Sequence, residues 1–380
     1  MNDTKTFPPF DLKRLLNTCF APEPGERLAL LIDLDNPSKV KGMQFVSESE
    51  WNVQRFAVEY FYKPLKEHLL EELHLLGGDL FAYEVTGGSN LDLPAQAFDL
   101  SGKSLSLIED ILPAYDIVLC ISTYSATAPL TALAKKIGFR GATLHGLNKI
   151  ILDTGLSVDY EEVSRQAEKL RLGMTRAQAA EIDFSVLGRN VSLRLILSEQ
   201  EAQKSHGLCR GKTPDIANLP AGEVYFVPTG AEGNFPRKFD DGSIAILEVR
   251  NGHVVAGELI SGKETALSEF LSMIKQDPAA GVIGELGFGT QELPASGRDI
   301  QDEKIFGTVH VATGRSDHLG GNITPDLFTN KKNATHEDIL FSPTKTPEID
   351  VSRVVMFRAG EETVLIEHFQ PSRYLRGLIQ

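Results

Sequence analysis

The sequence has few of the features that mark membrane, secreted or nucleic-acid-binding proteins. No apolar run approaches the roughly 18–20 residues that a membrane helix needs, and the N-terminal stretch MNDTKTFPPFDLKRLL lacks the apolar core of a signal peptide. The 380 residues include only 3 cysteines, which lie far apart, so we expect a cytoplasmic setting rather than a disulfide framework. Lysine and arginine form no cluster and the net charge is −14, so we expect neither a membrane nor a nucleic-acid partner.

Several common catalytic signatures are also absent. The sequence contains no G-x-x-x-x-G-K-S/T phosphate loop, no H-E-x-x-H zinc helix, no C-x-x-C pair and no G-x-S-x-G nucleophile turn. The stretch GELGFG (284–289) is similar to a broken dinucleotide fingerprint, but Thr-Gln-Glu-Leu-Pro follows it instead of a helix. Nucleotide binding at this stretch is therefore not predicted.

The first half of the chain alternates between strand-like and helix-like segments. A length of 380 residues favours two domains. Strands separated by helices indicate βαβ crossovers and a mostly parallel sheet, so we predict an α/β N-terminal domain over residues 1–180. The strand-like runs are 27–35, 78–86, 115–123 and 138–146.

The second half has a different pattern. Residues 243–260 alternate around Asn251-Gly252, a pair suited to a tight hairpin turn, and residues 354–369 form a second hairpin around Ala359-Gly360. One helix-like segment, 264–276, interrupts these strands. We therefore predict an α+β C-terminal domain rich in antiparallel strands over residues 181–380.

Five acidic and imidazole side chains stand in strand-like, apolar surroundings of this second half. His336 and Asp338 are two residues apart, so on a strand they point to the same face. His310 has small residues beside it on its own face, while Glu223 and Glu285 lie in apolar, glycine-containing stretches. A buried carboxylate needs cations or donors around it, and a metal ion would satisfy all five side chains together.

Each of these residues, taken alone, also fits a purely structural explanation. Glu223 and Glu285 fit surface acids at the edge of a turn, and His310 fits a core histidine bonded to backbone. His336 and Asp338 fit an exposed edge that forms ion pairs. The sequence pattern by itself leaves these alternatives open.

The order of four blocks is more informative than any one of them. NLPAGEVYFVP, GELGFGT, DEKIFGTVHVATG and NATHEDILF follow one another in this order. Together they resemble the aminopeptidase T family of metal-dependent exopeptidases, where N-L/M-P-x-x-E-V-F, L-G-E, H-I-A-L-G and H-x-D segments occur in the same order. The likeness is sharp over residues 215–341 and softer over the first half, where PGERLALLID matches the family's first strand.

The resemblance implies a ligand set and a function. It places metal ligands at Glu223, Glu285, His310, His336 and Asp338, with Glu223 and Glu285 also as catalytic carboxylates. It implies two divalent cations, zinc or cobalt, a homodimer around a large internal cavity, and removal of the N-terminal residue from short peptides. The number of candidate ligands agrees with two cations, because two imidazoles and three carboxylates exceed what one tetrahedral zinc needs. They suit two ions about 3.5–4 Å apart.

One loop departs from the family pattern. The family often has a tyrosine seven residues after the histidine of the H-I-A-L-G block, close enough to contact the metal. Here that position is Asp317, followed by His318, and the longer insert LGGNITPDLFTNKK comes next. Either Asp317 or His318 could substitute for the tyrosine, and we favour His318 as a further metal ligand, since imidazole is a common zinc ligand.

Three functions compete on this pattern. The first is a metalloaminopeptidase-like hydrolase acting on a peptide or another small molecule. The second is a mononuclear iron dioxygenase, because the family is related to dihydroxypyridine ring-cleaving dioxygenases that use two histidines and one carboxylate. In those relatives a histidine stands at the position of Glu285, so the glutamate favours the hydrolase. The third is a diverged binding protein without catalysis.

Overall fold

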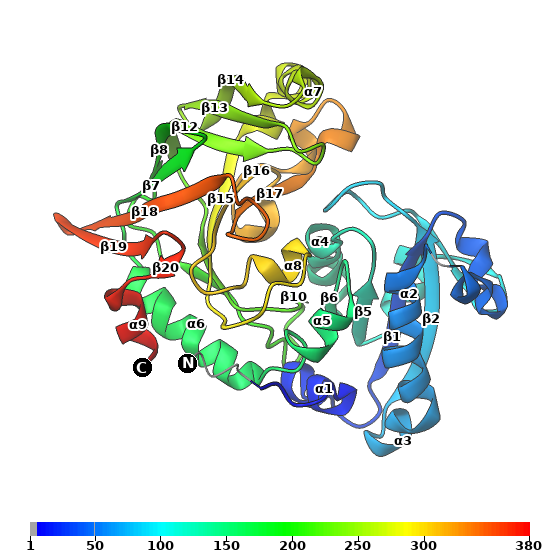
Figure 1. The fold of residues 1–380 in the computed structure, drawn as a ribbon. Helices are drawn as coiled ribbons and strands as arrows, with labels where there is room; N and C mark the ends of the chain where they lie inside the picture. The colour runs from blue at the N-terminus through cyan, green and yellow to red at the C-terminus, as the bar shows by residue number, and fades with distance from the viewer. Residues whose placement is uncertain (1–5, 49) are drawn as a thin grey trace. The chain divides into compact units, whose positions relative to one another are not determined.

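The computed structural model describes residues 6–48 and 50–380. The chain divides into two compact units (Figure 1). Unit 1 contains the residues up to Ser164 together with His206–Ala221, and unit 2 contains Arg165–Ser205 together with Gly222–Gln380. The sequence analysis placed a single boundary near residue 180, whereas the chain passes from unit 1 to unit 2, returns for His206–Ala221, and leaves again.

Unit 1 is built on a seven-stranded sheet in the order β10-β6-β5-β1-β2-β3-β4. The strands from β10 to β2 pair in parallel, while β3 and β4 add an antiparallel edge. The predicted α/β unit with a mostly parallel sheet is thus confirmed in outline. Its strands are β1 (Arg27–Leu34), β2 (Leu76–Glu84), β3 (Gln96–Asp99), β4 (Ser104–Ser106), β5 (Ile117–Ile121), β6 (Arg140–Thr143) and β10 (Ile216–Asn218).

Helices connect these strands, as the alternating sequence predicts. The Asp11 side chain caps the first of them by accepting a hydrogen bond from the amide of Arg14. The helix before β6 ends at Gly138, whose φ of 110° lies in the left-handed region that favours glycine. The helices are α1 (Leu12–Phe20), α2 (Asn52–Ala57), continued by π-helical turns to α3 (Leu70–Glu72), α4 (Thr127–Ile137) and α5 (Lys149–Asp153), while α6 (Tyr160–Met174) runs from unit 1 into unit 2.

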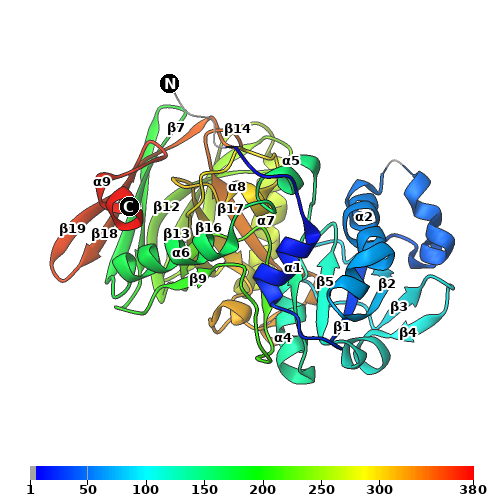
Figure 2. The ribbon, with the colours of Figure 1, turned by 90° about the horizontal axis from the view of Figure 1, so that it is seen from below.

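Unit 2 contains two antiparallel sheets. The larger has eight strands in the order β14-β13-β12-β8-β7-β18-β19-β20, and Figure 2 shows its C-terminal hairpin of β18 and β19 beside β7. These strands are β7 (Ala179–Val186), β8 (Arg189–Ile196), β12 (Gly230–Lys238), β13 (Ile244–Arg250), β14 (His253–Ser261), β18 (Ile349–Arg358), β19 (Glu361–Glu367) and β20 (Gln370–Pro371). Helices α7 (Glu264–Gln276) and α9 (Arg373–Ile379) belong to the same unit.

The smaller sheet of unit 2 has the strand order β17-β16-β15-β11-β9. Its strands are β9 (Gln203–Ser205), β11 (Glu223–Phe226), β15 (Ile283–Gly289), β16 (Val309–Gly314) and β17 (His336–Phe341), and the short helix α8 (Asp299–Asp302) lies between β15 and β16 in sequence. Apolar side chains of both sheets share one core, in which the rings of Phe184 and Phe341 lie 4.7 Å apart. This common core fixes the smaller sheet, which carries the candidate site.

The two predicted hairpins are both confirmed. Strands β13 and β14 pair across Asn251 and Gly252, whose φ values of 50° and 78° suit a tight turn. Strands β18 and β19 pair across Ala359 and Gly360 in the same way. Among the described residues, no helix is both long enough and apolar enough to cross a membrane.

Candidate metal centre

Four neighbouring strands of the smaller sheet bring the five predicted ligands together. Glu223 begins β11, Glu285 lies on β15, His310 on β16, and His336 and Asp338 on β17. The sheet register places Glu285 and Asp338 in one row across β16, with the small residue Ala312 between them. Residues far apart in the chain thus meet on one face because the strands pair with alternating side chains.

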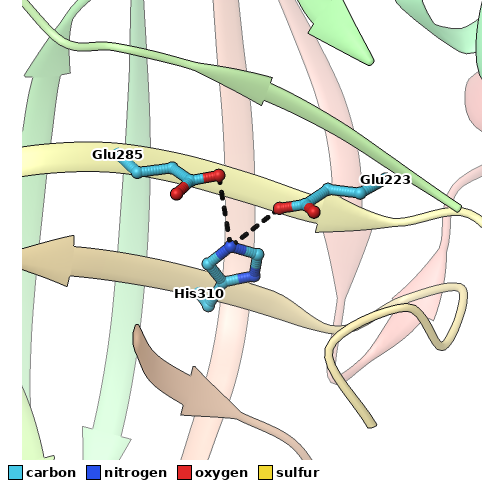
Figure 3. Close-up of side chains that lie close together, drawn as sticks. All are labelled: Glu223, Glu285 and His310. Atoms are coloured by element: carbon cyan, nitrogen blue, oxygen red, sulfur yellow. Dashed lines mark ion pairs between the residues drawn. The ribbon is translucent and has the colours of Figure 1, made fainter. Parts of the chain in front are cut away.

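The five side chains form two overlapping groups. In the first, here called the Glu223 group, His310 Nε2 lies 2.9 Å from Glu223 Oε1 and 3.6 Å from Glu285 Oε1 (Figure 3). In the second, the Asp338 group, His336 Nε2 lies 2.9 Å from Glu285 Oε2 and 3.2 Å from Asp338 Oδ1. Within each group the potential ligand atoms all lie within 4.8 Å of one another. Glu285 belongs to both groups and turns one oxygen toward each.

The centre is buried except at one corner. Glu223, Glu285, His310 and His336 are each at most 5% exposed, whereas the Asp338 side chain is 30% exposed. Solvent therefore reaches the groups on the side of Asp338. An open position beside buried ligands is the arrangement that catalytic metal sites need.

A glycine of β15 lets the side chains of the Glu223 group lie close to the strand. Gly287 pairs with His310 across β15 and β16. A methyl group at position 287 would lie 2.2 Å from His310 Nε2 and 2.6 Å from Glu223 Oε1, closer than any van der Waals contact. Only glycine allows both potential ligand atoms to lie in these positions.

The charge balance also favours a bound cation. Burial alone would lower the pKa of both imidazoles, yet Glu223 raises the pKa of His310 and Asp338 raises that of His336 well above the ordinary value. Lys304 and His310 lower the pKa of Glu223 despite its burial, and His336 lowers the pKa of Asp338. The surplus of carboxylates thus attracts positive charge, whether protons on the imidazoles or metal ions.

The backbone orients the ring of His336. Its Nδ1 lies 2.6 Å from the carbonyl oxygen of Arg315. A carbonyl oxygen only accepts, so Nδ1 carries a proton and donates it. In the cation-free protein Nε2 also donates to the carboxylates, and a cation that displaces this second proton would meet the Nε2 lone pair. Metal-binding histidines usually donate their other ring nitrogen in this way, so the donor set and the orientation of His336 fit a divalent cation.

The loop after β16 does not place another side chain in either group. Asp317, which stands where the family has tyrosine, forms a salt bridge with Arg315 (Nε–Oδ1 2.6 Å). The ring of His318 lies edge-on against the ring of His336, with centroids 4.9 Å apart. His318 therefore contacts a predicted ligand, and its role as a metal ligand stays a prediction.

Two buried charged residues at the centre were missed by sequence reasoning. Lys304 is 1% exposed, and its Nζ lies 2.6 Å from both Glu223 Oε2 and Glu303 Oε1. Burial and the neighbouring acids Asp338 and Glu223 raise the pKa of Glu303 to about 7, although Lys304 opposes the rise. In the sequence both belong to a charged run, Asp302-Glu303-Lys304, which is typical of a solvated surface.

No family model matches the chain, and no curated protein matches it. Among solved structures, the chain is similar to 2,5-dihydroxypyridine dioxygenase from Pseudomonas putida KT2440, with a TM-score of 0.56 and 14% sequence identity over 92% of each chain. At this identity the likeness shows a shared fold. Membership of the aminopeptidase T family stays a prediction.

Proposed function

We propose that this chain is a metal-dependent hydrolase that holds two divalent cations and removes N-terminal residues from peptides or cleaves a related small molecule. One observation carries the proposal: Glu285 is shared by two groups, each of which offers one imidazole and two carboxylates. A carboxylate with one oxygen directed to each group is suited to bridge two ions. Zinc and cobalt suit this mixture of nitrogen and oxygen ligands.

The residues of the centre then have separate tasks. Bound divalent cations supply Lewis acidity and lower the pKa of a coordinated water. Glu223, Glu285 and His310 hold one cation, and Glu285, His336 and Asp338 hold the other. Glu223 and Glu285 are the proposed acceptors of the water's proton, because their carboxylate oxygens line the buried side of the centre. Asp338 faces solvent, so substrate is expected to enter beside it.

Metal content and peptide cleavage test this proposal together. Protein stripped with chelator and reloaded with zinc or cobalt should bind two equivalents and release amino acids from aminoacyl-arylamides or short peptides. Glu285→Gln should lose cations from both groups, because it removes the shared charge, whereas Glu292→Gln, a control at an exposed position nearby, should keep both. Two bound equivalents without cleavage across a broad panel of peptides would refute the hydrolase.

A second function is favoured by the fold comparison. The likeness to a dihydroxypyridine dioxygenase supports a ring-cleaving dioxygenase with one non-haem iron. Such a centre needs two imidazoles and one carboxylate on a single iron, and Asp338 Oδ1 lies 3.2 Å from His336 Nε2 and 3.9 Å from His310 Nε2. One iron per chain, with oxygen uptake on a hydroxylated pyridine, would establish this second function over the first. The homodimer and the cytoplasmic setting remain part of the proposal, to be checked by sedimentation and by fractionation.

A further inference from the structure

Lys304 is the one buried ammonium that contacts a predicted ligand among the described residues. Its Nζ donates to Glu223 Oε2 and to Glu303 Oε1, at 2.6 Å each. Both acceptors are carboxylates, which favour the charged form of the lysine. Nζ hydrogen-bonds to Glu223 of the Glu223 group, and it acts on Asp338 of the other group through its charge.

The backbone around Lys304 is built to bring it to Glu223. Glu223 pairs with Gly289 across β11 and β15. A Cβ at position 289 would lie 2.2 Å from the carbonyl oxygen of Ile305 and 2.6 Å from the carbonyl carbon of Lys304, so only glycine lets this turn approach β15. The turn is also held by the amide of Gln291, which donates to the carbonyl oxygen of Lys304 at 2.8 Å.

Lys304, Glu223 and Glu303 form a buried group of three charges, here called the ion triad, and its contribution to stability does not explain why it is buried. Replacing buried ion pairs with apolar residues of similar size is often neutral or stabilising, because removing the charges from water is costly. The triad does have a geometric effect, because it occupies Oε2 of Glu223 and leaves Oε1 directed at His310. Glu223 can then offer a cation only this second oxygen.

We propose that Lys304 is a positioning residue of the metal centre, which fixes Glu223 as a one-oxygen ligand and thereby sets the affinity and geometry of the Glu223 group. The proposal rests on the proposed two-cation centre. It follows that the two groups fill unequally, with the Asp338 group first, because Lys304 occupies one oxygen of Glu223 and leaves the Glu223 group only the other. Lys304 therefore controls the affinity for the second cation that binds, and it leaves the affinity for the first almost unchanged.

The test is a cation titration of variants in which charge is conserved. Lys304→Met combined with Glu303→Gln removes the ammonium together with its second carboxylate partner, so Glu223 loses its lysine contact and no unpaired acid is left at position 303. Chelator-stripped protein is titrated with zinc by calorimetry, and with cobalt while its visible absorption is recorded. Lys238→Met is the control, since it breaks a lysine–carboxylate contact of 2.8 Å to Glu348, which lies outside both groups.

The double variant should bind the first equivalent like the original protein and the second about 10–100-fold more weakly. Its second cobalt equivalent should also absorb less, because a released Glu223 binds through both oxygens and raises the coordination number. Lys304→Arg, which keeps a charged donor, should restore most of the second-step affinity. The Lys238→Met control should match the original protein in both steps.

If the double variant binds the second cation with unchanged affinity and an unchanged cobalt spectrum, Lys304 does not position Glu223. The two-cation centre itself would not be affected by this result. Fewer than two equivalents bound by the original protein would overturn both proposals. Circular dichroism shows whether the double variant folds in chelator. If it does not, Lys304→Met is compared with Lys304→Arg instead. Equal affinities of these two variants for the second cation would refute the positioning role of Lys304.

Discussion

Gly287 offers a direct test of whether the space beside His310 exists to hold a cation. In Gly287→Ala, the new methyl group would lie 2.2 Å from both His310 Nε2 and His310 Cε1, more than 1 Å inside the ordinary contact distance of about 3.5 Å. His310 is 1% exposed and Glu223 is held by Lys304, so neither side chain can move away freely. We expect the Glu223 group to bind its cation about 10–100-fold more weakly, as for other disturbed ligand shells. Overpacking should lower the free energy of unfolding by about 1–3 kcal/mol.

The matched control for this substitution is Gly230→Ala in β12. There the nearest atom to a new Cβ is Ile196 Cγ1 at 3.7 Å, an ordinary contact, and stability should change by less than about 0.5 kcal/mol. Urea unfolding in chelator measures the packing cost, and zinc titration of both variants measures the effect on binding. Binding of both cations by Gly287→Ala with the original affinity would refute the reasoning.

Charged side chains at the centre and in unit 1 lead to two further predictions about stability. His310 and His336 have raised pKa values in the cation-free protein, so they stabilise it below the ordinary imidazole pKa of about 6.5, and this stabilisation is lost as pH rises through the raised values. The free energy of unfolding in chelator should therefore fall above about pH 6.5, and a flat profile would contradict the charge balance. In unit 1, Glu26→Gln leaves Arg140, 4% exposed, without its ionic partner and should cost about 3 kcal/mol in urea unfolding. Lys149→Met breaks an exposed ion pair and should cost about 0–1 kcal/mol, so equal losses would contradict the role of burial.

Local patterns predicted the strand-like runs and drew attention to the candidate residues, because both depend on spacing along the chain, whereas the ligand set itself was implied by the family resemblance. The two-residue spacing of His336 and Asp338 puts both on one face of β17, and the Asn251-Gly252 pair marks the turn of β13 and β14. The return of His206–Ala221 to unit 1 depends on the pairing of β10 with β6, across more than seventy residues. Spacing carries no information about such a contact. Lys304 was missed for the same reason, since its burial follows from the approach of its turn to β15 and its own neighbours in sequence are charged.

The glycines of the stretch GELGFG are explained by their contacts in the sheet. These glycines were considered as a phosphate-binding fingerprint, yet they lie in β15, where each leaves space for something specific. Gly287 leaves space beside His310 and Glu223 Oε1, while Gly289 lets the turn of Lys304 reach Glu223 Oε2. Two glycines on one strand thus let the two oxygens of a single glutamate face different partners, Oε1 the imidazole of His310 and Oε2 the ammonium of Lys304.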